Sequence, residues 1–451
     1  MSAGSSDAGD LTAVRAVDLL IEARWVVPVE PHGVVLDAHA VVVDGGCIVA
    51  VLPIADARKQ FSPRERVVLD EHALMPGLVN GHVHNPMTLM RGLADDLALM
   101  PWLQEHVWPA ESRVVGPEFV RDGVELAIAE MIRGGTTCCN ENYFFPDVQA
   151  ATYRRFGFRA RIGLPVIEFP TAWASSRDEY FEKALEVHDS LRGQPLLGTS
   201  FAPHAPYTVS NESFERIQLL SNQLDLPVHL HLHETASEIT DSLRDFGMRP
   251  FARIKQLGLI NERLIAVHMT QITEAEIADC AANGVSIVHN VESNMKLLSG
   301  FCPAEAIRRG GVNLAIGTDG CASNNDLDMF GEMRTAALVG KMIANDATAL
   351  DAATILRAAT LGSARAVGWN ELIGSIEPGK QADLAAVRLD DIETQPIYNV
   401  ISQLIYAAGR HQVSDVWIAG QQKLRDRQLT DIDTVEVVAK ARRWRERIAA
   451  A

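Results

Sequence analysis

Residues 76–84 read Pro76-Gly77-Leu78-Val79-Asn80-Gly81-His82-Val83-His84. The apolar run that leads into this stretch predicts a strand, and side chains two residues apart on a strand point to the same side. His82 and His84 would then project together from the end of the strand, as two imidazoles that share one metal ion must. A His-x-His pair does not establish a metal site by itself, so other parts of the chain must supply further ligands.

A regular alternation of strand and helix follows His84. Segments 117–133, 210–224, 273–283 and 302–309 carry apolar residues at helical spacing. Short β-type runs are found at 136–140, 160–167, 196–202, 228–233, 264–268, 285–289 and 313–318. With the strand that ends at His84 they make eight strand–helix units, which predicts an α/β fold with a (β/α)₈ TIM-type barrel.

The two ends of the chain predict a second, smaller β-domain. Short β-type runs with turn punctuation fill residues 11–74, including a hairpin signal at Asp44-Gly45-Gly46, and such runs return at 384–387 and 413–418. We therefore expect a composite β-sandwich domain of residues 11–74 and 375–432 beside a barrel of residues 75–374. A disordered tail is expected at 1–10 and a C-terminal helix at 433–451.

The composition narrows the classes of partner. Lys and Arg number 41 against 58 Asp and Glu, a net charge of −17, so we expect neither nucleic acid nor an anionic membrane surface as a partner. The six cysteines form no C-x-x-C pair, which favours reduced thiols. The N-terminus lacks a signal-peptide pattern and no apolar run is long enough to span a membrane, so a cytoplasmic location is expected.

Polar side chains gather where the predicted strands end, at the rim that builds the active site of a (β/α)₈ barrel. Eight of the chain's 14 histidines lie at or beside these ends, more than chance or core packing would place there. The candidates are His82, His84, Asn140 or Glu141, His204, His229, His231, His233, Glu234, His268, His289 and Asp319. The imidazoles of His229, His231 and His233 share one face of their strand, so alternation alone does not choose a ligand among them. His289 is expected to be structural.

These residues resemble the motifs of the amidohydrolase superfamily, in its mononuclear branch of purine and pyrimidine deaminases. The matching pieces are His82-x-His84, His231-Leu232-His233-Glu234, His268, Thr318-Asp319 and Ile376-x-Pro378-Gly379-x-x-Ala382-Asp383-Leu384. Within that branch the chain resembles the 5′-methylthioadenosine/S-adenosylhomocysteine deaminases, through Trp108-Pro109-Ala110-Glu111, Pro203-His204-Ala205-Pro206-Tyr207 and Ser293-Asn294-Met295-Lys296-Leu297. The resemblance covers the whole chain. It implies hydrolytic deamination of methylthioadenosine, S-adenosylhomocysteine or adenosine to the inosine analogue and ammonia.

The resemblance implies a metal site made of His82, His84, His231 and Asp319. Three imidazoles and a carboxylate suit one Zn²⁺ per subunit, with Fe²⁺ or Mn²⁺ as alternatives. A cation in such a site lowers the pKa of its water toward neutrality. Asp319 would accept the proton of that water, and His268 would orient the water.

The resemblance also implies residues that act on the substrate. Glu234 would protonate a ring nitrogen, N1 of adenine, while the water attacks the neighbouring carbon beside Asp319. Glu111 would accept hydrogen bonds from the ribose 2′ and 3′ hydroxyls, and His204 would hydrogen-bond the purine ring. Arg159 and Arg161 match the family's homocysteine-binding arginine only loosely, which places methylthioadenosine ahead of S-adenosylhomocysteine.

Two other functions fit part of the sequence. The first is hydrolysis of another amino- or chloro-substituted N-heterocycle, such as a triazine, guanine or a pterin. The second is a metal-free scaffold, which the complete ligand set speaks against. The expected partner is a small purine nucleoside, and a homo-oligomer is expected because such assemblies are common in this superfamily. Among the remaining candidates, we expect His229 to pack deeper in the barrel and His233 to line the pocket, whereas Trp102 and Trp108 fit either a pocket wall or loop packing.

Overall fold

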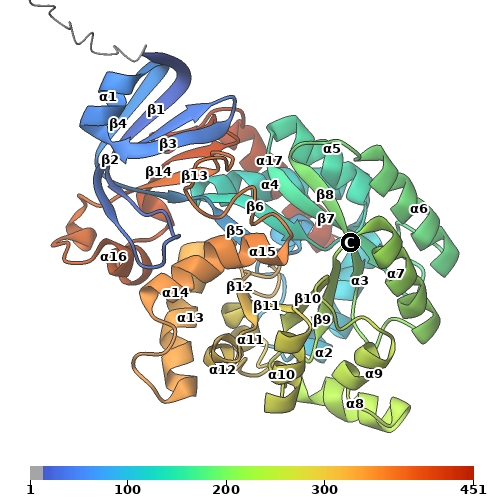
Figure 1. The fold of residues 1–451 in the computed structure, drawn as a ribbon. Coiled ribbons are helices and arrows are strands. Elements are labelled where there is room, and N and C mark those ends of the chain that lie inside the picture. The colour runs from blue at the N-terminus through green and yellow to red at the C-terminus, as the bar shows by residue number, and fades with distance from the viewer. Residues whose placement is uncertain (1–13, 451) are drawn as a thin grey trace, which may run out of the picture.

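The computed structural model describes residues 14–450, and its centre is a sheet of eight parallel strands wound into a barrel (Figure 1). The strands are β5 (Leu78–Val83), β6 (Thr136–Glu141), β7 (Arg159–Val166), β8 (Leu197–Pro203), β9 (Val228–Leu232), β10 (Leu264–His268), β11 (Ser286–His289) and β12 (Asn313–Ile316). They follow one another around the sheet in chain order. Each coincides with a predicted run to within about two residues at most boundaries, and the predicted (β/α)₈ barrel is confirmed.

Hydrogen bonds between β5 and the residues after β12 close the barrel. Asn80 Nδ2 donates to Thr318 Oγ1 at 2.7 Å, and the Thr318 N–H donates to Asn80 Oδ1 at 3.0 Å. The Asp319 N–H then donates to the carbonyl of His82 at 3.0 Å. Gly317 permits this close approach, because a Cβ there would lie 2.7 Å from the His82 nitrogen. The stretch that leads into the two histidines therefore also places Asp319 beside them.

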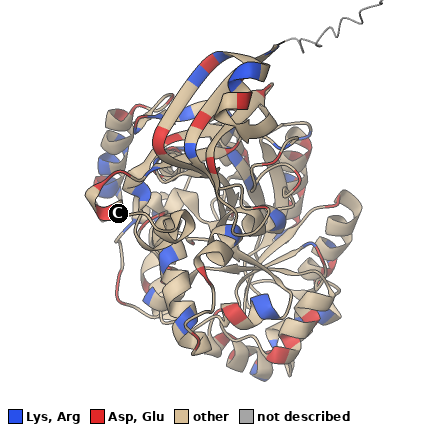
Figure 2. Cartoon of the chain, turned by 60° about the vertical axis from the view of Figure 1, so that its left-hand side comes forward, with Lys and Arg blue, Asp and Glu red and all other residues tan. Residues whose placement is uncertain are grey.

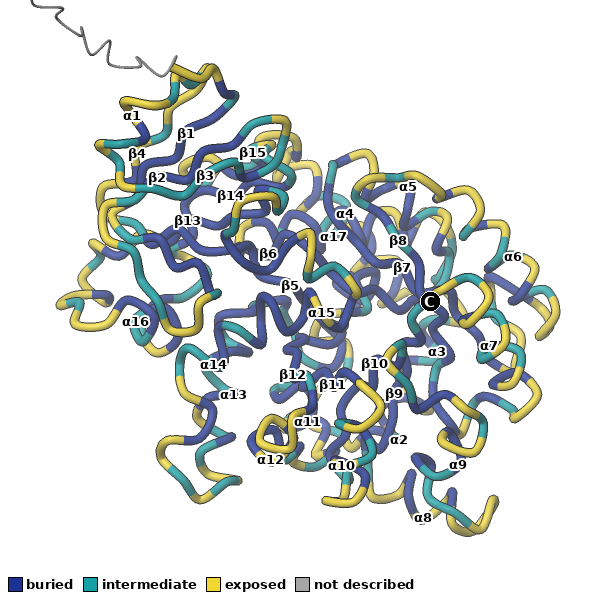
Figure 3. The backbone as a smooth tube through the Cα atoms, in the orientation of Figure 1, coloured by how far each residue is buried: buried dark blue, intermediate teal, exposed yellow. Residues whose placement is uncertain are grey.

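Helices surround the barrel, and their inner faces join the strands in one large apolar core. They include α4 (Pro117–Arg133), α5 (Pro146–Phe156), α6 (Arg177–Ser190), α7 (Asn211–Leu224), α8 (Ala236–Phe246), α9 (Pro250–Gln256), α10 (Glu274–Ala282), α11 (Val291–Lys296), α12 (Ala304–Arg309), α13 (Met329–Ala344), α14 (Ala352–Arg357) and α15 (Ser363–Ala366). Ser210 and Thr273 begin α7 and α10, because each side chain accepts a hydrogen bond from a backbone N–H of the first turn. The tube in Figure 3 is accordingly buried along the barrel strands and exposed along the outer helices.

A second sheet takes strands from both ends of the chain. It runs in the order β16-β15-β14-β13-β4-β1-β2-β3. The strands are β1 (Arg15–Val26), β2 (Leu36–Asp44), β3 (Cys47–Pro53), β4 (Phe61–Pro76), β13 (Leu384–Arg388), β14 (Val413–Ile418), β15 (Gln421–Arg425) and β16 (Gln428–Leu429), with helices α1 (Ile54–Gln60) and α16 (Val400–Tyr406) beside them in the chain. The domain limits at 74/75 and 374/375 remain predictions, and the expected tail at 1–10 lies outside the described residues.

Buried polar contacts tie the chain ends to the barrel. Arg159 Nε on β7 donates at 2.7 Å to Oδ2 of Asp383, the residue just before β13. The C-terminal helix α17 (Thr434–Ala450) lies on α4, where Trp444 Nε1 donates to Asp122 Oδ2 at 2.9 Å. Figure 2 shows Lys and Arg interspersed with Asp and Glu around the outer helices and the small sheet. Among the described residues, no helix is both long and apolar enough to cross a membrane.

Candidate active site

The carboxyl ends of the barrel strands bring four residues together that are far apart in the sequence. His82 Nε2 lies 3.2 Å and His84 Nε2 lies 3.3 Å from Asp319 Oδ1. His231 Nε2 lies 3.4 Å from His84 Nε2. The structure therefore brings to one point the four residues that the sequence motifs singled out as metal ligands.

Hydrogen bonds turn one nitrogen of each ring toward this point. Nδ1 of His84 donates to the carbonyl of Asn142, and Nδ1 of His231 donates to the carbonyl of His204 at 2.6 Å. Because a neutral imidazole has one donor and one acceptor nitrogen, each of these rings presents the lone pair of Nε2 to the cluster when it is in its neutral form. Burial lowers the pKa of His231 well below its ordinary value and keeps that ring in the neutral, metal-binding form.

Asp319 is oriented by a separate set of donors. Its Oδ2 accepts hydrogen bonds from Ser293 Oγ at 2.6 Å and Ser323 Oγ at 2.8 Å, and its Oδ1 accepts the Gly320 N–H at 2.8 Å while facing the imidazoles. The backbone is left-handed at Asp319 (φ 64°) and at His268 (φ 75°). Such a conformation costs a residue with a Cβ about 1–3 kcal/mol. The chain accepts this strain where it aims side chains into the barrel mouth.

The cluster fits a divalent metal ion. His82 Nε2 is fully buried and has no hydrogen-bond partner among residues 14–450, which is costly unless a ligand satisfies it. Three imidazole nitrogens and one carboxylate oxygen suit a borderline ion such as Zn²⁺. Two overlapping groups of residues, His82-His84-Asp319 and His82-His231-His268, each bring three candidate ligand atoms within 4.8 Å of one another.

Glu234 and His268 flank this cluster. His268 Nδ1 hydrogen-bonds Asn294 Oδ1 at 2.8 Å, and its Nε2 lies 3.8 Å from Glu234 Oε2. Glu234 Oε1 accepts a hydrogen bond from Ser299 Oγ at 3.1 Å. Burial raises the pKa of Glu234, which favours its protonated form. A carboxylic acid in this position is suited to donate a proton.

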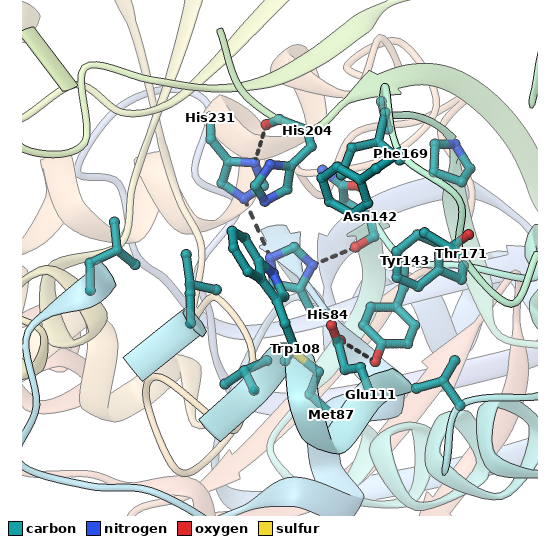
Figure 4. Close-up of a pocket in the computed structure, with 18 of the residues that line it drawn as sticks. His84, Met87, Trp108, Glu111, Asn142, Tyr143, Phe169, Thr171, His204 and His231 are labelled. Atoms are coloured by element: carbon teal, nitrogen blue, oxygen red, sulfur yellow. Dashed lines mark hydrogen bonds between the residues drawn. The ribbon is translucent and has the colours of Figure 1, made fainter. Parts of the chain in front are cut away.

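A cavity of about 360 Å³ opens from the cluster, within the range of small-molecule sites (Figure 4). Glu111 lies in its wall, where it accepts a hydrogen bond from the Tyr143 hydroxyl at 2.5 Å and where burial raises its pKa to about 7. His204 also lines the cavity, with Nδ1 2.9 Å from Thr208 Oγ1, and burial lowers its pKa to about 4. Both predicted substrate residues thus share one cavity with the candidate metal cluster.

His233 is turned away from the site. β9 ends at Leu232, and His233 has a left-handed backbone (φ 54°), so the alternation of a strand no longer applies to it. Its Nε2 accepts the N–H of Phe251 at 3.0 Å, and its ring does not line the cavity. The expectation that His233 lines the pocket is therefore wrong. Trp102 and Trp108, for which the sequence left two alternatives, both line it.

One supporting contact, made by His229, and one supporting residue, Glu238, were not identified from the sequence. His229 lies deeper in the barrel, as expected, but its Nε2 also lies 2.8 Å from His82 Nδ1. Glu238 accepts the N–H of Glu234 at 2.8 Å and so holds the backbone of that residue. The spacing Thr235-x-x-Glu238 after a strand is a helix-capping signal that could have pointed to Glu238. The contact of His229 carried no such signal.

A (β/α)₈ barrel with clustered imidazoles and a carboxylate at its strand ends defines a metal-dependent hydrolase of the barrel type. A sequence model of the Amidohydrolase family matches residues 73–423, and the chain belongs to that family. This confirms the superfamily that the motifs indicated. A 5-methylthioadenosine/S-adenosylhomocysteine deaminase of Teredinibacter turnerae is 44% identical over 440 residues, 98% of this chain and 100% of that protein. A relative of the same name in Saccharophagus degradans is 43% identical and covers 98% and 99%.

Solved structures agree with the fold. The crystal structure of an adenosine deaminase from Xanthomonas campestris with bound zinc superposes with a TM-score of 0.97 and 66% identity, over 97% of this chain and all of that one. An atrazine chlorohydrolase from Arthrobacter aurescens has a TM-score of 0.88 at 23% identity, over 94% of this chain and 99% of that one. The second likeness concerns the fold alone.

Proposed function

We propose that this chain is a metal-dependent deaminase of adenine nucleosides. Its substrates would be 5′-methylthioadenosine, S-adenosylhomocysteine or adenosine, and its products the inosine analogue and ammonia. The observation that carries the proposal is the single cavity that joins the candidate metal cluster, the protonatable Glu234 and the carboxylate of Glu111. The names of the relatives at 43–44% identity and of the Xanthomonas structure support it.

The proposed reaction uses His82, His84, His231 and Asp319 to hold the ion, which supplies a water of lowered pKa. Glu234 donates its proton to N1 of the adenine ring while the water oxygen attacks C6, and Asp319 accepts the first proton of that water. Asp319 passes this proton to the leaving amino group, which departs as ammonia when the C6–N bond breaks. The second water proton returns to Glu234, and N1 keeps the proton it received, as the inosine lactam requires.

His268 has a positioning part in this scheme. Because Asn294 holds Nδ1 of His268, the ring presents Nε2 to the attacking water and fixes its direction. Glu111 would accept hydrogen bonds from two vicinal ribose hydroxyls with its two oxygens. His204, neutral at pH 7, would hydrogen-bond the purine ring.

Zinc is the ion that we propose, on the donor set and on the zinc in the Xanthomonas relative. Fe²⁺ and Mn²⁺ remain alternatives, and metal analysis of protein purified without added metal distinguishes them. The expected homo-oligomer also remains a prediction, which light scattering coupled to size-exclusion chromatography tests.

A comparison of substrates tests the function. Zinc-loaded protein is assayed for ammonia and for the adenine-to-hypoxanthine absorbance change with methylthioadenosine, S-adenosylhomocysteine, adenosine and a substituted triazine. Turnover of at least one nucleoside above the triazine supports the proposal. Turnover of the triazine alone would show that the substrate is another N-heterocycle and not an adenine nucleoside.

A further inference from the structure

A buried carboxylate lies behind the candidate metal cluster and takes no part in the reaction proposed above. Glu141 is the last residue of β6 and is fully buried. It is not among the described residues that line the cavity, so it does not touch a substrate there. A buried carboxylate is costly unless its oxygens are satisfied. The contacts that satisfy Glu141 show which part of the site it supports.

Three groups donate hydrogen bonds to Glu141. The backbone nitrogen of Asn85 lies 3.1 Å from both Oε1 and Oε2, and the backbone nitrogen of Asn142 lies 3.1 Å from Oε1. The Tyr153 hydroxyl donates to Oε2 at 2.8 Å, and its own oxygen accepts the side-chain amide of Asn85 at 2.6 Å. Because each group presents a hydrogen to Glu141, the surroundings are built for an acceptor without a proton, which is a carboxylate.

Two of these donors fix His84 from two sides. The amide of Asn85 belongs to the peptide bond that follows His84, so a hydrogen bond to it fixes the backbone from which the imidazole projects. Asn142 supplies the carbonyl that accepts the hydrogen bond of His84 Nδ1. The N–H of Asn142 also donates to the carbonyl of Val83 at 3.0 Å, which joins the ends of β5 and β6. Glu141 thus holds both the position and the rotation of the His84 ring.

We infer that Glu141 is a positioning residue for the metal site, which acts by fixing the backbone after His84 and the carbonyl that orients the His84 ring. The inference rests on the metal site of the proposed function. It goes beyond that function because it assigns a task to a residue that touches neither the substrate nor the ion.

His84 depends on such support because no strand holds it. β5 ends at Val83, and the side chain of His84 is 16% exposed against 0% for His82. Groups that orient a ligand imidazole commonly contribute about 10- to 100-fold to metal affinity. A buried carboxylate with its donors on two segments of the rim can supply this orientation without entering the cavity.

Glu141→Gln changes the hydrogen bonds but keeps the shape of the side chain. Its NH₂ group would face groups that also donate, so at least one of the hydrogen bonds to this side chain is lost. We expect the zinc affinity, measured by chelator competition at pH 8, to fall about 10- to 100-fold. Burial raises the pKa of Glu141 to about 7, so the wild-type side chain is mostly the carboxylate at pH 8.

Cobalt reports the geometry of the site without any turnover. Co²⁺ binds the same kinds of ligand as Zn²⁺, and its visible absorption depends on the coordination geometry. We expect the visible bands of Co²⁺-loaded Glu141→Gln to differ in position or intensity from those of the wild type. A loss of packing away from the site would leave these bands unchanged.

Glu22→Gln is the matched control. Glu22 is a buried carboxylate of the small sheet, 2.7 Å from Arg58 and 2.8 Å from Arg66. Its replacement should lower the stability to urea but leave the zinc affinity and the Co²⁺ bands as in the wild type.

Tyr153→Phe keeps the question open to test if Glu141→Gln does not fold. It removes one donor while Glu141 keeps its charge and both backbone hydrogen bonds. The loss should weaken zinc binding less than Glu141→Gln does, by about three- to tenfold.

The outcomes separate the two proposals. A wild-type protein that binds no zinc overturns the metal site and with it the proposed function. A wild-type protein that binds zinc, with Glu141→Gln equal to it in zinc affinity and in Co²⁺ bands, overturns the positioning role alone. An unchanged zinc affinity in Tyr153→Phe does the same where Glu141→Gln does not fold. Weaker zinc binding in both variants, with wild-type affinity in Glu22→Gln, supports the inference.

Discussion

Replacing Glu234 by glutamine removes one proton from the site and little else. Glutamine has the same shape, its carbonyl can still accept the hydrogen bond that Ser299 Oγ donates to Oε1 at 3.1 Å, and its amide would occupy the place of Oε2, 3.8 Å from His268 Nε2. Substrate binding and metal binding should therefore change little. The loss of a positioned general acid should lower kcat about 10²–10⁴-fold, or about 3–5 kcal/mol of transition-state stabilisation.

Steady-state kinetics with methylthioadenosine and metal analysis measure this. Glu234→Gln should keep the wild-type metal content and a KM within a few-fold of wild type. Ser299→Ala is the matched control, because it removes the hydrogen bond but leaves the proton on Glu234, and it should lower kcat by less than about tenfold. A Glu234→Gln protein with full metal content and a kcat within threefold of wild type would refute the assigned proton transfer.

Three other changes test the surroundings of the reaction. Glu111→Gln should raise KM for nucleosides about 10- to 100-fold with kcat changed less, because a charge-assisted hydrogen bond is lost. Tyr143→Phe should raise KM less, and an unchanged KM in Glu111→Gln argues against ribose binding by Glu111. His229→Leu should weaken zinc binding about 10- to 100-fold in chelator competition, since it removes the acceptor 2.8 Å from His82 Nδ1. His229→Gln should retain most of the zinc affinity, and equal losses of affinity in the two variants would count against this contact. Burial raises the pKa of Glu238 to about 8 from 4.5, so between these values the unfolded chain loses a proton that the folded chain keeps. This group should then lower the free energy of unfolding by up to about 1.4 kcal/mol per pH unit as pH rises. Urea denaturation at pH 5, 6 and 7 measures the slope, which should be less steep by up to that amount in Glu238→Gln than in the wild type.

The barrel was predictable because its signals are local and repeated. The strand before His84 and the seven β-type runs after it alternate with segments whose apolar residues recur at helical spacing. Helices such as α7 begin at a capping serine that can be recognised in the sequence. The gathering of the candidate ligands at one rim was predictable for the same reason, since parallel strands place their carboxyl ends there, whereas the choice of His231 over His229 and His233 came from the family resemblance.

The features of the site that could not be predicted from the sequence depend on backbone conformation and on contacts between distant segments. The left-handed backbone of His233 reverses the side that strand alternation assigns to it. Tyr143, which follows β6, reaches Glu111 on helix α3 (Trp108–Val114). Ser293 on α11 and Ser323 in the loop after β12 reach Asp319. Such contacts arise from the way the loops fold over the rim, for which a single sequence carries no periodic signal.

The most direct test of the account is an anomalous difference map, at the zinc absorption edge, from crystals of the zinc-loaded protein. The account predicts one strong peak per chain, about 2.0–2.2 Å from Nε2 of His82, His84 and His231 and from a carboxylate oxygen of Asp319. A strong peak bound by other side chains, or a peak at the rim that lacks His231 or Asp319 as a ligand, would contradict it.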